Sequence, residues 1–404
     1  MERNFYYIAQ GKLHAYKNGA AREVSSGVLD AYLRRVKDSA QRNEWKHTGE
    51  GAMFREAYVP GADVESRVAG VVSKVHCAAE YGDSLIYSLS IDRTTGIYRQ
   101  FAESSSEGIV LSGGNFAYQD FDVLGDCCAV SAGFAGESHI GVLRIGTTDC
   151  RIHTEGHCWD SQPVWSKTEP DTIFFCSAGL AETPNQEERS QRPMDMSQMA
   201  TRMFTSAAQA VTRGPSAIMK LDVSRDTLDE WIADDTHDYI RPQSMADGSL
   251  YYIRRPYTAD NGTSMWGCLG EIVMLPVRIL GALFGFLNVF SAKYSGKTLS
   301  KSVGVKNRDE EKLFIEGNLI SAEAELRANR NRGEQNPGII PHSWELHCRK
   351  RNGDDVLVRR GVVAYRVDDQ TGDILFSNGS AILNLSPDGK EEKILSADQV
   401  TFIR

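Results

Sequence analysis

The sequence lacks the excess of basic residues that a general nucleic-acid-binding protein needs. Its 404 residues include 45 Lys and Arg against 54 Asp and Glu, which gives a net charge of −9 and a pI near 5.6. Proteins bind phosphate backbones by neutralising their charge with a basic face. We therefore expect no nucleic-acid partner.

An apolar leader segment is also lacking. The chain begins MERNFYYIAQGKLHAYKNG, in which charged residues come at once and apolar and polar residues then alternate. No apolar stretch is followed by a small-residue cleavage site. This pattern predicts a mature fold and a cytoplasmic location. The eight cysteines are scattered, with Cys127 next to Cys128, so we expect reduced thiols and no disulfide framework.

Common catalytic signatures are missing from the sequence. There is no Gly-x-Ser-x-Gly elbow, and YSGKTLSKS lacks the upstream glycine of a phosphate-binding P-loop. The segment HTEGHCW holds His153, His157 and Cys158, but strand residues four apart lie about 13 Å from each other, too far to share a metal ion. We therefore predict no catalytic residue, no metal site and no cofactor.

A short β-type unit recurs along the chain. Each copy places an acidic or glycine turn before a short apolar run, as in GDSLIYSLSI, GDCCAVSAGF, EPDTIFFCSA, ADGSLYYIRR and TGDILFSNGS. Asp83, Asp126 and Asp171 recur 43 and 45 residues apart, a period typical of four-stranded propeller blades. These aspartates, with Asp247 and Asp373, are expected to accept turn N–H groups. The repeat predicts an all-β protein.

The two ends of the chain predict how the repeat closes. The C-terminal DQVTFIR has the pattern of a lone strand, and NFYYIAQ, KLHAYK and AREVSS near the N-terminus have the pattern of three more. Together they make one blade, and closure of this kind leaves no open sheet edge. We expect one six-bladed β-propeller domain over residues 1–404. Its other blades are predicted at about 68–112, 115–157, 162–238, 241–361 and 362–397.

One copy of the repeat resembles a known family. The segment QPVWSKTEPDTIFFCSAG, residues 162–179, is similar to the WD40-like repeat of TolB-type propellers, in which a Pro-x-Trp-Ser strand leads through a turn into an apolar strand. RPQSMADGSLYYIRR and SPDGKEEKIL resemble parts of it. The resemblance implies a propeller fold, which hosts many functions. Cytoplasmic bacterial propellers of this type are found with MoxR-like ATPases and von Willebrand-type proteins, which would be partners of a scaffold.

Three insertions, at about 28–66, 181–214 and 257–342, interrupt the repeat. Strand direction alternates within a blade, so connections from second to third strand and from blade to blade open on one face. We expect all three insertions there, in helical form. The sequence DEEKLFIEGNLISAEAELRANR predicts an amphipathic helix over 309–332 in the third.

Two insertions carry apolar stripes at helical spacing. The stripe of the first predicts a helix packed on the propeller rim and comprises Val28, Leu29, Tyr32, Leu33 and Val36. The stripe of the second comprises Met196, Met199, Met203, Ala207 and Val211. Thioether side chains adapt to irregular surfaces. This stripe therefore fits either a partner surface or packing against the neighbouring insertion.

The longest apolar run, GEIVMLPVRILGALFGFLNVF, spans residues 270–290 in the third insertion. It is nearly long enough to cross a bilayer. However, Pro276 and Arg278 lie near its middle, and both flanks belong to one predicted blade, which a single crossing would divide. Three interpretations stay open: buried core, a docking surface for a protein or a second copy, and a contact with an anionic membrane surface. Besides the three methionines, the predicted contact residues are Trp266, Ile272, Leu275, Ile279, Leu283, Phe284, Phe286, Phe290, Lys293 and Lys297.

These patterns favour a noncatalytic propeller scaffold. It would bind a protein partner, at a membrane surface in one version, through helical insertions on one face. The alternative is a propeller enzyme, of hydrolase or lyase type, with its site in the central channel. A cluster of inward polar residues with a carboxylate of perturbed pKa would favour the alternative. A dry, apolar channel would count against it.

Overall fold

The computed structural model of the protein describes most of the chain. The described residues are 3–42, 64–92, 94–101, 106–113, 116–134, 136–147, 149–182, 211–258, 312–316 and 318–404. All of the predicted contact residues, from Met196 to Lys297, lie outside these ranges. Their roles therefore stay predictions.

The described chain is mostly β-structure, which confirms the predicted all-β class. One four-stranded sheet contains both ends of the chain, because β26 pairs antiparallel with β1 and places Ile403 opposite Tyr7. Its strands, in spatial order, are β26 (Val400–Ile403), β1 (Phe5–Ala9), β2 (Lys12–Lys17) and β3 (Ala20–Glu23). These are the four runs that the sequence marked as strands.

Three further sheets each have four antiparallel strands in chain order. The first comprises β4 (Ser73–Tyr81), β5 (Ser84–Ile91), β6 (Thr94–Phe101) and β7 (Glu107–Ser112). The second comprises β16 (His237–Ser244), β17 (Leu250–Pro256), β20 (Glu345–Arg349) and β21 (Asp355–Arg360). The third comprises β22 (Ala364–Val367), β23 (Ile374–Ser377), β24 (Ala381–Leu385) and β25 (Glu391–Ser396).

The remaining large sheet has eight strands and joins two groups of four. The first group is β8 (Ala117–Leu124), β9 (Cys127–Phe134), β10 (Glu137–Arg144) and β11 (Cys150–Ile152). The second group is β12 (Cys158–Trp165), β13 (Thr172–Glu182), β14 (Val211–Asp222) and β15 (Thr227–Ile232). A single parallel pair, Ser138 with Trp159, links β10 to β12. The sequence placed the starts of two blades at residues 162 and 241. These positions lie within β12 and β16, so both blades begin a few residues earlier than predicted.

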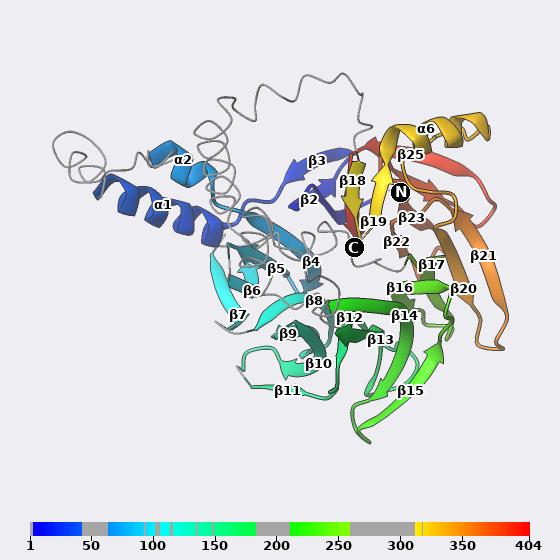
Figure 1. The fold of residues 1–404 in the computed structure, drawn as a ribbon, viewed down its shortest axis with the longest axis horizontal. Helices are drawn as coiled ribbons and strands as arrows, with labels where there is room; N and C mark the ends of the chain where they lie inside the picture. The colour runs from blue at the N-terminus through cyan, green and yellow to red at the C-terminus, as the bar shows by residue number, and fades with distance from the viewer. Residues whose placement is uncertain are drawn as a thin grey trace, which may run out of the picture.

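The sheets surround a common centre, in chain order (Figure 1). Each group contacts the next through its inner strand: β1 contacts β4, β4 contacts β8, β8 contacts β12, β12 contacts β16, and β16 contacts β22. β22 in turn contacts β26, which belongs to the same sheet as β1. Hydrophobic cores fill the space between neighbouring sheets; for example, Ile86 and Ile97 pack with Phe121 and Val130. Sheets packed face to face bury apolar side chains in this way. The side chains of the inner strands that do not pack in these cores include those that line the centre.

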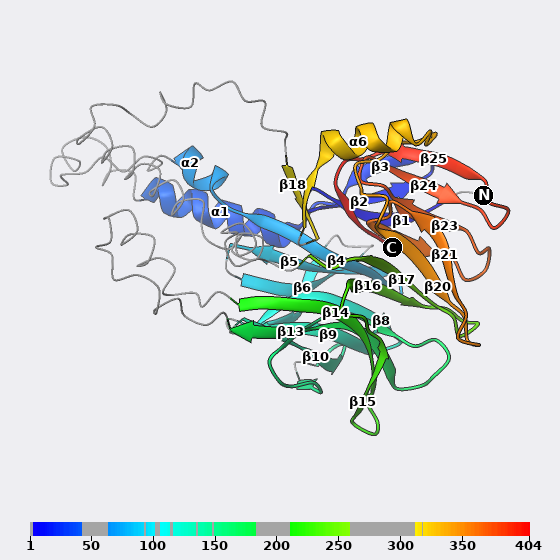
Figure 2. The same ribbon diagram turned by 45° about the vertical axis from the view of Figure 1, so that its right-hand side comes forward.

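Three helices lie outside the sheets in the described chain: α1 (Gly27–Arg42), α2 (Val64–Ala69) and α6 (Ala322–Asn331). Val28, Leu29 and Tyr32 of α1 pack on the core of the β4–β7 sheet, and the rest of α1 extends away from the sheets (Figure 2). No helix in the described residues is long and apolar enough to cross a membrane.

The helix predicted over 309–332 is wrong in its first half. Residues there form a hairpin of β18 (Lys312–Ile315) and β19 (Asn318–Ser321), and α6 begins only at Ala322. KLFI and NLIS are short apolar runs separated in sequence by Glu316 and a glycine, and glycine is a common turn residue. Glu316 has the left-handed φ of 49° that such a turn requires. Short apolar runs fit both helix and strand periods, and the turn residues decided between them.

Candidate functional site

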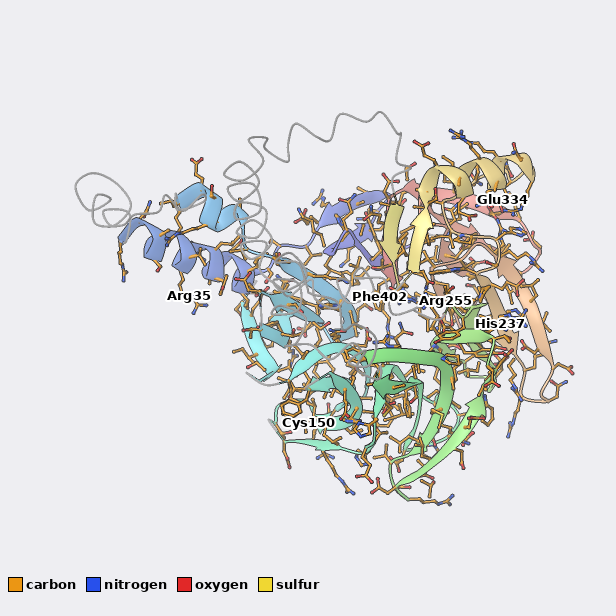
Figure 3. The ribbon with its side chains drawn as sticks, in the orientation of Figure 1. Arg35, Cys150, His237, Arg255, Glu334 and Phe402 are labelled. Atoms are coloured by element: carbon orange, nitrogen blue, oxygen red, sulfur yellow. The ribbon has the colours of Figure 1, made fainter. Side chains whose placement is uncertain are left out.

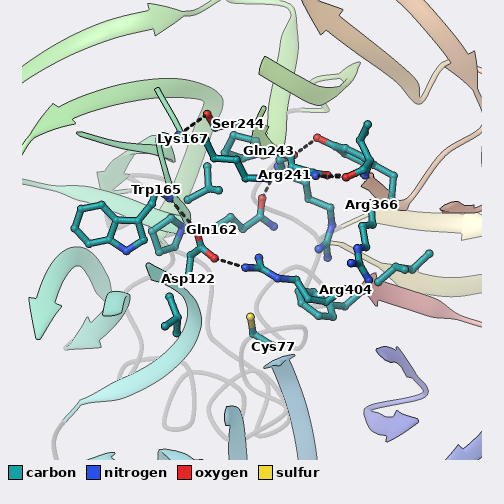
Figure 4. Close-up of a pocket in the computed structure, with 18 of the residues that line it drawn as sticks. Cys77, Asp122, Gln162, Trp165, Lys167, Arg241, Gln243, Ser244, Arg366 and Arg404 are labelled. Atoms are coloured by element: carbon teal, nitrogen blue, oxygen red, sulfur yellow. Dashed lines mark hydrogen bonds and ion pairs between the residues drawn. The ribbon is translucent and has the colours of Figure 1, made fainter. Parts of the chain in front are cut away.

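A cavity of about 500 Å³ lies where the inner strands meet. Residues of β4, β8, β12, β16, β22 and β26 line it, together with loops that follow several of these strands (Figure 4). Phe402, which lines the cavity, lies near the middle of the molecule, whereas Arg35 is on the outlying α1 (Figure 3). The cavity therefore occupies the centre that the sheets surround.

Irregular backbone in the inner strands forms part of the cavity wall. The β8, β12 and β16 ladders each contain a register shift beside it. Within two of these bulges, Gln162 and Arg241 have left-handed φ values of 53° and 56°. Each precedes a proline, which cannot donate a ladder hydrogen bond. Non-glycine residues held in this conformation are found preferentially at functional sites.

A charged cluster lies on the side of the centre where β16 begins. Glu316, in the turn of the β18–β19 hairpin, accepts a hydrogen bond from Nη2 of Arg241 at 2.7 Å. Its main-chain oxygen accepts another from Nη1 of Arg255 at 2.7 Å. Nε of Arg255 donates in turn to Asp238 at 3.1 Å. The hairpin is thus tied to β16 and β17 by buried and half-buried charges.

Asp120 is the carboxylate of the cavity with a strongly raised pKa. Burial raises the pKa of Asp120 to about 6, and repulsion from Glu316 acts in the same direction. The charge of Arg241 and the main-chain N–H of Gln162 act against this rise. A carboxyl group in this range changes its charge near neutral pH.

Asp122 joins three of the inner strands. It is 5% exposed, accepts the main-chain N–H of Trp165 at 2.9 Å, and accepts Nη2 of Arg404 at 2.6 Å. Loops at the far ends of β12, β16 and β22 are linked in a similar way. Lys167 pairs with Asp369, which also accepts the main-chain N–H of Ala246 at 3.0 Å.

Arg366, on β22, differs from the other cations of the cavity. Lys167, Arg241 and Arg404 each have a carboxylate partner, but the side chain of Arg366 makes no hydrogen bond or ion pair with any described residue. Burial and repulsion from Arg404 lower the pKa of Arg366, and attraction to the carboxylates of Glu80 and Asp368 acts against this decrease. The two side chains lie in the same cavity (Figure 4). They leave one guanidinium group that an anion could pair with.

Cys77, the one cysteine among the described residues that line the cavity, is not an activated nucleophile. Sγ of Cys77 donates to the main-chain oxygen of Phe121 at 3.2 Å, and burial, reinforced by Asp120, raises the pKa of Cys77 to about 12. The thiolate, which is the reactive form, is therefore scarce at neutral pH. Beside it, burial and Lys74 lower the pKa of His76 to about 3, which makes it a weak base.

The residues considered from the sequence lie elsewhere. His153 pairs with Asp226 at 2.9 Å and His157 with Glu137 at 2.6 Å, so the HTEGHCW residues point to different partners. The repeated acidic positions lie at turns outside the cavity: Asp83, Asp126, Asp171, Asp247 and Asp373.

Sequence reasoning missed Asp120, Arg241 and Arg366. One signal was available for part of the site, since Gln162 and Arg241 are each followed by proline inside a strand pattern, which marks a bulge. Nothing in the local pattern distinguishes Arg366 from a surface arginine.

The sequence matches no family model, and a search of curated protein sequences found no match. Among solved structures, the chain is similar in fold to TolB from Acinetobacter baumannii, with 9% identity and a TM-score of 0.46 over 99% of this chain and 64% of that one. It thus spans less than two thirds of that protein.

A putative TolB from Agrobacterium tumefaciens matches with 10% identity and a TM-score of 0.42, over 81% of this chain and 82% of that one. An oligogalacturonate lyase from Vibrio parahaemolyticus matches with 9% identity and a TM-score of 0.37, over 80% of this chain and 79% of that one. The resemblance to TolB-type propellers is one of fold. Because the matched structures include an enzyme, they do not distinguish a scaffold from a catalyst.

Proposed function

We propose that the protein is a six-bladed β-propeller that binds a small anionic ligand in its central channel and does not transform it. Four blades are the four-stranded sheets. The other two are the halves of the eight-stranded sheet, β8–β11 and β12–β15. The contacts from β1 round to β22 and β26, together with the β26–β1 pair, support a closed ring.

The unpaired Arg366 is the observation that carries the binding proposal. A guanidinium group forms paired hydrogen bonds with a carboxylate or a phosphate. An anion beside Arg366 would also reduce the repulsion between Arg366 and Arg404. A volume of about 500 Å³ falls within the range of small-molecule sites. The ligand class is therefore a small carboxylate or phosphate.

Calorimetric titration tests this binding. The probes are succinate and inorganic phosphate, and succinamide is the uncharged control. We expect saturable binding of at least one anion, no binding of succinamide, and binding weakened by about tenfold or more in Arg366→Ala. The matched control is Arg22→Ala, which removes an exposed arginine on β3. Binding that is equal in the wild type and Arg366→Ala, or no binding of either anion, would contradict the proposal.

The enzyme alternative is favoured by one observation, the pKa of Asp120 near 6. A group that titrates near the working pH is suited to acid or base catalysis. The polar lining of the cavity also agrees with what that alternative predicts. Mass spectrometry of the bound probes after incubation with the protein separates the two functions. A new product that is absent with Asp120→Asn would identify an enzyme, whereas unchanged probes support binding alone.

Partner binding through the insertions is a separate part of the proposal. Residues 183–210 connect β13 to β14, and the third insertion connects β17 to β20, so both join second to third strands of their blades. In a propeller such connections open on one face, which a scaffold could use. We propose a cytoplasmic scaffold of this kind, with or without contact to an anionic membrane. Deletion of 181–214 and 262–335 without loss of partner capture would contradict it.

A further inference from the structure

A cluster of metal-ligating side chains lies at the seam of the eight-stranded sheet, outside the central cavity. Sγ of Cys158 lies 3.8 Å from Nδ1 of His139, and Oδ2 of Asp160 lies 3.9 Å from the same nitrogen. The three ligand atoms all lie within 4.8 Å of one another. Of the three, the sequence pattern had drawn attention only to Cys158, because His139 lies on a different strand from the other two.

The strand register explains why these side chains meet. β10 and β12 run parallel at the seam, with Ser138 opposite Trp159. His139 is next to Ser138 in sequence, and Cys158 and Asp160 flank Trp159. Because side chains alternate between the two faces of a sheet, all three point to the same face. The site is therefore built from strand residues, whose positions are fixed by the ladder.

Asp160 supplies a second, independent observation. Its side chain is 2% exposed, and Oδ1 has no hydrogen-bond partner of normal geometry among the described residues, although Ser177 and Cys158 lie close enough to the carboxylate to lower its pKa. Oδ2 accepts a hydrogen bond from Thr154 at 2.5 Å. A buried carboxylate with an unsatisfied oxygen is costly in the absence of a cation. A metal ion coordinated by this carboxylate would offset that cost.

We propose that His139, Cys158 and Asp160 bind a divalent transition metal ion, with Zn²⁺ as the expected ion. Thiolate, imidazole and carboxylate together are a donor set that suits Zn²⁺. Zn–ligand bonds of about 2.0–2.3 Å place tetrahedral ligand atoms about 3.3–3.6 Å apart, so small side-chain movements complete the site. Three protein ligands leave the fourth position to water or to another donor.

Glu137 has the position of a supporting residue. Its Oε2 lies 3.6 Å from Nε2 of His139, on the side of the imidazole opposite the ligating Nδ1. Its Oε1 accepts a hydrogen bond from Nδ1 of His157 at 2.6 Å. Carboxylates that contact the distal nitrogen of a ligating histidine orient the ring and increase its basicity. Glu137 therefore fixes Nδ1 of His139 toward the metal.

Metal uptake by the full-length chain tests the site. Protein freed of metal by chelation is titrated with Zn²⁺ by calorimetry and with Co²⁺ by absorption spectroscopy. We expect one high-affinity Zn²⁺ per chain and, with Co²⁺, a thiolate charge-transfer band together with the visible bands of a tetrahedral ion. Cys158→Ser should abolish the charge-transfer band. Cys158→Ser and His139→Gln should each weaken Zn²⁺ binding by at least about tenfold.

Two control variants separate this site from other thiols and histidines. Cys127→Ser removes a partly buried thiol on β9, and His157→Gln removes an exposed histidine beside the site. Both should still give the Co²⁺ charge-transfer band. Circular dichroism checks the fold, and Cys158, which is only partly buried, is the variant to rely on if His139→Gln unfolds. No uptake of either metal, or equal uptake by Cys158→Ser and the wild type, would overturn the proposal.

Discussion

Replacement of Asp120 by asparagine tests the electrostatics of the cavity. Burial and Glu316 raise the pKa of Asp120 to about 6 in the folded protein, from an ordinary value of 3.8. Between these two values the folded protein retains a proton that the unfolded chain has already lost. Ionisation of Asp120 therefore costs stability as the pH rises from about 4 through 6. Asparagine keeps the shape of the side chain and removes this cost.

The size of the effect follows from the difference in pKa. A shift of about two pH units corresponds to about 3 kcal/mol in the free energy of unfolding once both states are ionised. We therefore expect Asp120→Asn to stabilise the protein by up to about 3 kcal/mol at pH 8. The expected stabilisation falls to about half of this value at pH 5 and becomes small below pH 4, because Asp120 is then protonated in the folded protein.

Urea unfolding followed by tryptophan fluorescence measures this difference at pH 4, 5, 6.5 and 8. The matched control is Asp83→Asn, which changes an exposed turn aspartate and should alter stability by less than about 0.5 kcal/mol at each pH. If Asp120→Asn destabilises the protein at pH 8, the view of Asp120 as a strained buried charge is wrong. A difference from the wild type that is constant from pH 4 to pH 8 would refute it equally.

Three further outcomes are expected. Asp122→Ala leaves buried hydrogen-bond donors without their acceptor and should cost about 3 kcal/mol in the same urea assay, and an unchanged midpoint would contradict this role. Gly338→Ala would overlap the main-chain oxygen of Asn378 and should lower the Tm clearly, whereas a wild-type Tm would count against this packing. In flotation with anionic liposomes, the wild type is compared with Ile279→Asp/Phe286→Asp. Flotation of the wild type alone, weakened by salt, indicates a membrane contact. Flotation of neither protein, with the variant folded and monodisperse, indicates a docking surface, and a misfolded variant indicates core.

The sequence was sufficient for the β-class and for the strands at the two ends of the chain. Period-two alternation and turn residues are local, so they can be read without knowledge of the fold. The same reasoning was wrong over 309–332. The pattern of KLFIEGNLIS predicted a helix, but the structure has a hairpin there. The contacts of Glu316 with Arg241 and Arg255 stabilise that hairpin.

Only the tertiary structure decided which polar residues act together. Asp120, Arg241, Glu316 and Arg366 come from four separate elements, and apart from the proline that follows Arg241, no neighbour in sequence marks them as part of a site. The metal-ligating set likewise depends on the register between β10 and β12. Local sequence specifies which face of a strand is buried, because that depends on alternation. It does not specify which strands converge, because that depends on how whole sheets pack around the centre.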